Sequence, residues 1–92
     1  EYLFPSDSRY ITDADLAQFT KDEIVLLRNE IYARHGYVFS DPKISAYFAS
    51  QSWYLPIEGV NASTFDSSVF NNYEQTNLDT ILAYERTMGW RQ

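Results

Sequence analysis

The segment from residue 20 to 36 constrains the fold most, because it carries signals for both ends of one helix. Thr20 and Glu23 have the spacing of a capping box, in which each side chain accepts a hydrogen bond from the other residue's backbone amide. Gly36 can adopt the left-handed conformation that ends many helices. The sequence therefore predicts a helix of about four turns that starts at Lys21 and ends before Gly36.

Two polar side chains fall on the apolar face of this helix. Ile24, Leu27 and Ile31 form the apolar stripe, and helical periodicity places Arg28 and His35 on the same side. Leaving one member of a buried ion pair without its partner costs roughly 3–5 kcal/mol. We therefore expect a fixed partner for Arg28.

The last helix shows the same pattern, because Glu74 and Asn77 interrupt its apolar face. That face is otherwise formed by Phe70, Leu78 and Ile81. We predict that Arg28 and Glu74 pair across the core. Arg28, Asn29, Glu74 and Asn77 could line a polar pocket for a small ligand, but their inward positions favour a buried network that fixes the register of two helices.

His35 has two interpretations. It could act as a general base beside Arg28 and Glu74. We favour a structural role, in which the histidine donates to a carbonyl at the helix end and packs its ring among aromatic side chains. Arg34 follows Glu30 by one turn, and we expect this pair on the surface, worth a few tenths of a kcal/mol.

The remaining elements follow from similar signals. Thr12 and Asp15 predict a capping box for a short helix, and Asp41 with Pro42 predicts the start of a third helix. The last helix is expected from near Asp66 or Ser67 to Thr87. We predict an all-α fold, a small compact bundle of about four helices with a long aromatic-anchored loop between the last two. Residues 1–11 form an extended lead-in or linker end, 12–88 a single helical domain and 89–92 a tail.

Three aromatic residues are the candidate ligand contacts. Trp53 and Tyr54 lie in the unpatterned segment 51–63, and Trp90 follows the last helix. Exposed rings of this kind bind partners well because they bury much area at little entropic cost. The alternative is that Trp53 and Tyr54 close the core beneath the loop, and that Trp90 packs on the bundle. We favour the structural role for Trp53 and Tyr54.

Composition excludes several functions. The 92-residue chain has a net charge of −6, which disfavours nucleic acid and anionic membrane surfaces. With one histidine and no cysteine, only a carboxylate-rich oxygen site is conceivable for a metal, and no calcium-loop spacing is present, so we expect neither a metal nor a cofactor. Serine and threonine are scattered without a nucleophile motif, so we expect no enzymatic activity. No apolar run is long enough for direct membrane insertion.

One stretch of the chain resembles a known family. The run from Arg28 to Gly36 contains Tyr-Ala-Arg-His-Gly at residues 32–36, and it is followed in order by Phe39, Tyr47-Phe48, Trp53-Tyr54, Asn72, Glu74 and Asn77. This pattern resembles the YARHG domain over roughly residues 10–85. The resemblance implies a small bacterial domain, taken to be extracellular and suggested to bind ligands, with no catalytic residues to carry over.

The functional hypothesis follows from this resemblance. We expect a non-catalytic extracellular or cell-surface recognition or accessory module of a bacterial protein, with an envelope glycan or a peptide as the candidate ligand. The alternative is a structural spacer or protein-interaction domain with no small ligand, and a hydrolase that uses His35 is a distant third. We expect a monomeric domain within a larger chain, since the sequence begins without methionine.

Overall fold

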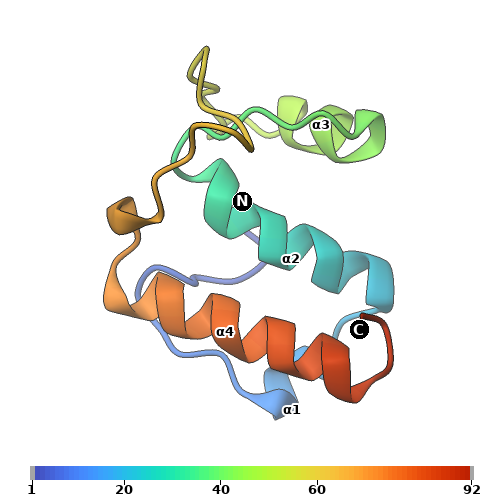
Figure 1. Cartoon of the computed structure of the whole chain (residues 1–92). Coiled ribbons are helices and arrows are strands. Elements are labelled where there is room, and N and C mark those ends of the chain that lie inside the picture. Colours follow the sequence, from blue (N-terminus) through green and yellow to red (C-terminus); the bar gives the residue numbers. More distant parts are fainter. Residues whose placement is uncertain (1, 92) are drawn as a thin grey trace.

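The computed structural model describes residues 2–91, so Glu1 and Gln92, the outer ends of the predicted lead-in and tail, lie outside it. The described residues form four α-helices and one 3-10 turn, and no strand, which confirms the all-α class. The elements are α1 (Asp13–Leu16), α2 (Lys21–Ala33), α3 (Pro42–Ala49), η1 (Ser67–Val69) and α4 (Asn72–Thr87). Figure 1 shows α2 between α3 and α4.

The predicted capping boxes are both present. Thr20 accepts from the amide of Glu23 at 3.2 Å, and the Glu23 carboxylate accepts from the amide of Thr20 at 2.8 Å. Thr12 and Asp15 form the same pair of bonds at the start of α1. Asp41 caps α3, with Pro42 as its first residue. Local sequence therefore determines where three of the four α-helices begin.

The end of α2 has the predicted Schellman geometry. Gly36 has a φ of 79°, the Gly36 amide donates to the Ala33 carbonyl at 3.1 Å, and the Tyr37 amide donates to the Tyr32 carbonyl at 3.4 Å. The rings of Tyr32 and Tyr37 lie 5.3 Å apart, as expected when the residue after the glycine folds back.

The predicted start of α4 is wrong by about one and a half turns, because the helix begins at Asn72. Residues Ser67–Val69 form the separate 3-10 turn η1, and Phe70 has extended backbone with a ψ of 139°. The helix begins only after Asn71, whose side chain accepts from the amide of Glu74 at 2.8 Å while the Glu74 carboxylate accepts from the amide of Asn71 at 3.0 Å. This third capping box outweighs the apolar pattern that extended the predicted helix to Asp66.

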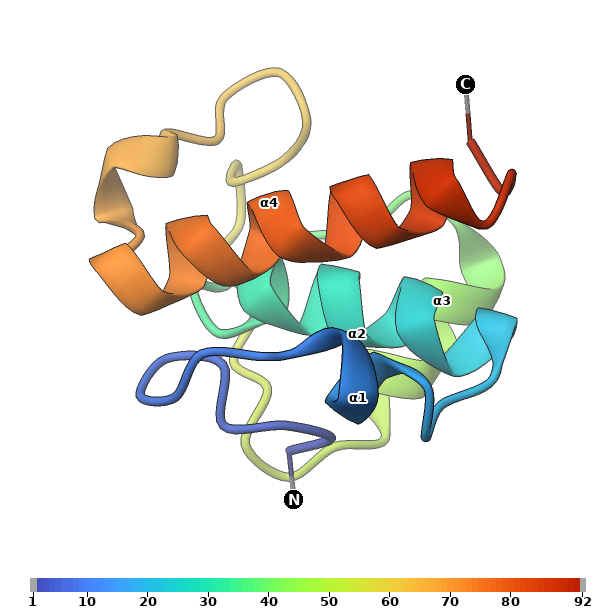
Figure 2. The ribbon, with the colours of Figure 1, turned by 90° about the horizontal axis from the view of Figure 1, so that it is seen from below.

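The core lies between α2, α4 and the N-terminal residues. α2 and α4 run antiparallel side by side, and the N-terminal segment passes along them before it enters α1 (Figure 2). The buried side chains of this core are Phe4, Ile11, Leu16, Ile24, Leu27, Ile31, Leu78 and Ile81. Because two of the eight come from residues 2–11, that segment is part of the packed interior.

Aromatic rings pack around α3, which contacts α2 on the side away from α4 (Figure 1). Phe48 is completely buried, and its ring stacks on Phe39 at 5.0 Å. Trp53 and Tyr54 each lie 5.9 Å from the same ring. The loop after α3 is therefore anchored by aromatic contacts, as the sequence predicted.

Gly36 should be the least replaceable glycine. A Cβ added there would meet Ile57 Cγ1 at 2.5 Å and Ile57 Cβ at 3.1 Å, whereas a Cβ at Gly89, with a similar φ of 77°, would meet nothing. The left-handed conformation costs an L-residue about 1–2 kcal/mol, and overpacking adds about 1–3 kcal/mol. Urea unfolding should show Gly36→Ala losing about 2–5 kcal/mol and Gly89→Ala only about 1–2 kcal/mol.

The steric part of that loss has its own control. In an Ile57→Ala background, Gly36→Ala should cost no more than Gly89→Ala, because the clashing side chain is gone. Equal costs for the two glycine substitutions in the parent chain would contradict the argument.

Candidate functional site

The predicted pairing of Arg28 with Glu74 is wrong, and each residue has another partner. Arg28 Nε donates to Glu85 Oε1 at 2.9 Å and Arg28 Nη2 to Glu85 Oε2 at 3.3 Å. Glu74 Oε2 lies 2.8 Å from His35 Nε2. Antiparallel packing explains the exchange: the start of α4 lies beside the end of α2, so Glu74 meets His35, and Arg28, farther back along α2, meets Glu85.

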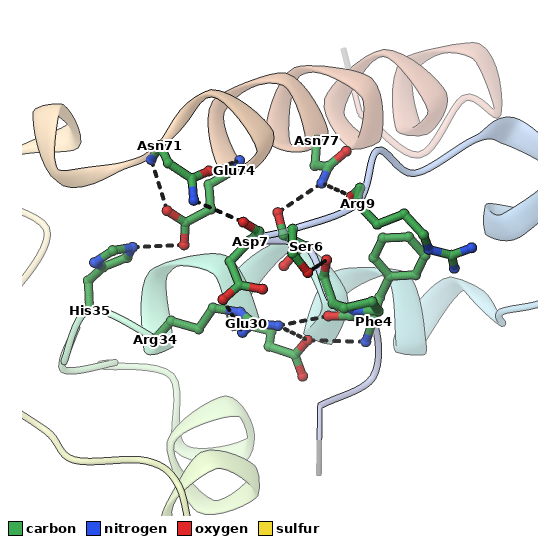
Figure 3. Close-up of polar contacts among 12 residues, drawn as sticks. Phe4, Ser6, Asp7, Arg9, Glu30, Arg34, His35, Asn71, Glu74 and Asn77 are labelled. Atoms are coloured by element: carbon green, nitrogen blue, oxygen red, sulfur yellow. Dashed lines mark hydrogen bonds and ion pairs between the residues drawn. The ribbon is translucent and has the colours of Figure 1, made fainter.

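His35 forms a link between two elements. Its ring contacts Phe70 edge-on at 5.4 Å, which agrees with the expected packing among aromatic side chains. The expected bond to a helix-end carbonyl is replaced by the contact with Glu74. The other Glu74 oxygen accepts from the amide of Asn71 (Figure 3). Both oxygens of the carboxylate are thus engaged, and they join the loop after α2 to the first turn of α4.

Glu30 and Arg34 form the predicted pair, but it is buried and does not lie on the surface. Glu30 is completely buried, and its carboxylate accepts from the amides of Leu3 at 2.8 Å and Phe4 at 3.4 Å. Arg34 Nη2 lies 3.7 Å from Glu30 Oε1. The missed signal is positional: Glu30 lies three residues after Leu27, at the edge of the apolar stripe.

Arg34 holds the N-terminal segment from the same side. Its side chain is only 6% exposed, Nη2 donates to the Phe4 carbonyl at 2.8 Å and Nη1 lies 3.5 Å from the Asp7 carboxylate (Figure 3). The guanidinium also lies 3.6 Å above the centre of the Tyr2 ring. Residues 2–7 therefore bind the buried side of α2 through backbone as well as side-chain groups.

Asn77 has the corresponding role on α4. It is completely buried, and its Oδ1 accepts from the amide of Ile11 at 2.8 Å. Its Nδ2 donates to the carbonyls of Ser6 at 2.9 Å and Arg9 at 2.8 Å (Figure 3). Both oxygens of Glu74 and both polar side-chain atoms of Asn77 thus have partners within the chain.

Arg28 and Asn29 contribute to a different feature, a cleft of about 440 Å³ between α2 and the segment before η1. The cleft is lined by Arg28, Asn29, Tyr32, Tyr37, Ala62, Phe65 and Ser67. No acidic residue lines it. Four of its lining residues come from α2 and the turn that follows, so the conformation of Gly36 also positions Tyr37 in the cleft wall.

The cleft combines aromatic rings with hydrogen-bonding groups. Phe65 lies 5.0 Å from the Tyr32 ring and 5.5 Å from the Tyr37 ring. Burial raises the pKa of the Tyr32 hydroxyl, the nearby Tyr37 raises it further, and Arg28 acts in the opposite direction. Tyr32 therefore stays protonated at neutral pH and can donate a hydrogen bond. Such a mixture of rings and a few polar groups is typical of small-molecule sites.

The three aromatic candidates lie outside this cleft. Trp53 packs its ring 4.7 Å from Tyr2, and the Tyr54 hydroxyl donates to the Tyr37 carbonyl at 2.5 Å. Trp90 lies 5.9 Å from the Tyr84 ring, with the Lys21 ammonium 5.9 Å from its own ring. Trp53, Tyr54 and Trp90 are all partly buried. Among residues 2–91, no three potential metal ligands cluster together.

Comparison with known proteins gives one match. The family model for the YARHG domain matches residues 1–86. No curated protein and no solved structure matches the chain. Within the part of the chain that the structure describes, no helix has the length and apolar content needed to cross a membrane.

Removing the Asn77 side chain should destabilise the domain strongly. Asn77→Ala leaves the Ile11 amide and two carbonyls without their partner, and an unsatisfied buried group costs about 1–3 kcal/mol. We expect a loss of about 3 kcal/mol or more in the free energy of unfolding. Gln75→Ala, on the exposed side of α4, is the control and should stay within about 0.5 kcal/mol. Similar small losses for both variants would contradict the role of Asn77.

Glu30 should make stability depend on pH. Burial raises the pKa of its carboxyl above 4.5, although the Leu3 and Phe4 amides and Arg34 lower it in part. The folded state then binds the proton more tightly than the unfolded state, so this stabilising contribution is full below pH 4.5 and is lost as pH rises through the raised pKa.

Urea unfolding between about pH 4 and pH 7 measures this effect against the Glu30→Gln variant. The stability of the parent relative to the variant should be greatest at the acid end and should decline as pH rises. A relative stability that grows with pH would mean that the hydrogen bonds and Arg34 outweigh burial.

Proposed function

The chain belongs to the YARHG domain family, and on that premise we propose that it is a non-catalytic recognition module that binds a small ligand outside the bacterial cell or at its surface. The cleft lined by Arg28, Tyr32, Tyr37 and Phe65 is the observation that carries the proposal. It offers ring faces, hydroxyl donors and one cation within a volume suited to a small ligand.

The engagement of the titratable residues supports a non-catalytic role. Glu74 is divided between His35 and the cap of α4, and Glu85 binds both Arg28 and Arg91. Glu30 holds the amides of the N-terminal segment. A general base must reach the proton of a bound substrate, and these carboxylates are instead occupied by structural hydrogen bonds.

The proposed location follows from the family. The YARHG-type pattern from Tyr32 to Gly36 is the basis for placing the domain in extracellular bacterial proteins, and an envelope glycan or a peptide is the ligand class we favour. The ligand site differs from the aromatic loop suggested by the sequence, because the rings of Trp53 and Tyr54 are partly covered by Phe48 and Tyr2.

A protein-interaction domain is the second candidate, and an exposed apolar strip favours it. Leu55, Ile57 and Val38 are 76%, 54% and 39% exposed. Backbone hydrogen bonds from Ile57 to Gly36 and from Val38 to Val60 hold the two segments of the strip together. Exposed apolar side chains gathered in one place are typical of protein contact sites.

Titration of the isotope-labelled domain, followed by amide chemical shifts, tests the proposal. The panel contains mono- and disaccharides and short peptides, and a ligand should shift the amides of Arg28, Tyr32, Tyr37 and Phe65 in a saturable way. Tyr37→Phe keeps the ring and removes the hydroxyl, so it should weaken binding about 3- to 10-fold, the loss of one neutral hydrogen bond. Tyr73→Phe is the matched control, because Tyr73 is an exposed residue of α4 that does not line the cleft, and this variant should bind like the parent.

Two outcomes would count against a ligand cleft. One is the absence of cleft shifts with every compound in the panel. The other is a concentration-dependent shift confined to Val38, Leu55 and Ile57, which would favour the protein-interaction domain.

A further inference from the structure

We propose that the cleft selects a sugar that carries a carboxylate, with Arg28 Nη1 as the anion-binding group. This inference rests on the proposed ligand-binding function and specifies the ligand class. It is carried by three features of the cleft: the orientation of Arg28, the charge around it and the groups that face the rest of the ligand.

Arg28 is fixed by one side of its guanidinium. Nε and Nη2 donate to the two oxygens of Glu85, while Nη1 has no partner among residues 2–91. The Arg28 side chain as a whole is 20% exposed, and the residue is one of those that line the cleft. A guanidinium held in place in this way loses little further freedom when it binds a carboxylate.

The net charge around Arg28 favours a ligand that carries a single negative charge. Glu85 is only 3% exposed and is shared by two cations, because Arg91 Nε lies 3.3 Å from the same oxygen that accepts from Arg28 Nε. Two guanidinium groups and one carboxylate leave one net positive charge beside a cleft that no acid lines. The rest of the chain is acidic, with an overall net charge of −6, so this positive site is local.

One positive charge matches a carboxylate better than a phosphate monoester. A phosphate monoester carries about −1.5 to −2 at neutral pH and is usually bound by several donors or cations. Arg28 is the only charged residue that lines the cleft, and the other polar lining residues are neutral. A carboxylate on Arg28 would leave no excess charge in the partly buried site.

The remaining groups suit a sugar ring. The Tyr32 and Tyr37 hydroxyls and the Ser67 hydroxyl belong to lining residues and can exchange hydrogen bonds with sugar hydroxyls. Asn29 donates its Nδ2 to the Val25 carbonyl at 2.8 Å, which leaves Oδ1 to accept from the ligand. The ring of Phe65, beside those of Tyr32 and Tyr37, offers apolar surface to the C–H face of the sugar.

The test compares probes that differ in one group. Glucose, glucuronate and glucose 6-phosphate share the ring and carry no charge, a carboxylate or a phosphate, and N-acetylalanine carries a carboxylate without a sugar. Amide shifts of the cleft residues give the affinity of each. Glucuronate should bind at least about tenfold more tightly than glucose, as expected for one added charge-assisted contact, and added salt should reduce that ratio.

Two arginine variants test the charge argument. Arg91→Ala leaves Glu85 to neutralise Arg28 alone, so the ratio of glucuronate to glucose affinity should fall several-fold while glucose binding is unchanged. Arg86→Ala removes an exposed arginine from the same helix and should keep the parent's ratio. Neither residue lines the cleft, and a thermal melt of each variant confirms folding.

Each contrary result has a separate meaning. Equal affinity for glucose and glucuronate would overturn the carboxylate preference and leave the cleft as a sugar site. Tighter binding of glucose 6-phosphate would overturn it in favour of phosphate, and equal binding of N-acetylalanine would overturn the sugar component. If no probe shifts the cleft amides but another compound in the wider panel does, this inference fails and the proposed function stands.

Discussion

Burial of polar side chains against the N-terminal backbone is the constraint on which the structure depends. Glu30 on α2 and Asn77 on α4 are completely excluded from solvent, and a buried carboxylate or carboxamide without partners is costly. Their partners are main-chain groups of residues 3–11. The two long helices and the N-terminal segment therefore stabilise one another, since removing any one leaves polar groups of the others unsatisfied.

The same arrangement distinguishes polar side chains that are fully used to hold the fold together from one that can still bind a ligand. Glu74, Glu30 and Asn77 face inward and are satisfied within the chain, as Figure 3 shows. Arg28 differs because Glu85 engages only one side of its guanidinium. Recognition is accordingly proposed at Arg28, which also lines the cleft, and its ion pair with Glu85 holds the guanidinium in place for a ligand.

Local signals in the sequence predicted much of the fold, but they could not predict which side chains pair between different helices. The caps at Thr12, Thr20 and Asp41 and the Schellman ending at Gly36 each depend on residues within six positions, so spacing alone revealed them. The partner of Arg28 depends on the antiparallel alignment of two helices, which no local pattern contains. For the same reason, helical periodicity predicted that certain polar residues point inward, but it could not predict their hydrogen-bond partners.

The candidate site was harder to predict than the fold. Its walls join residues of α2 to Ala62, Phe65 and Ser67, from a segment with no periodicity. Phe65 carried no pattern that distinguished it. Glu30 and Arg34 have the spacing of a surface pair, and that spacing does not show that both residues also bind backbone groups of residues 3 and 4 in the interior. Buried side chains that bind main-chain groups are difficult to recognise in a sequence, even though they hold the fold together.

The contacts of Asn77 also have a consequence for how the chain folds as it is synthesised. Ile11 and Ser6 precede their partner by 66 and 71 residues, so the N-terminal segment leaves the ribosome long before α4 exists. Until α4 emerges, α2 can form its capped helix, but the buried face that residues 3–11 complete remains open to solvent. Nascent chains that lack the last helix are therefore expected to expose the core, and folding is completed only after α4 has left the ribosome.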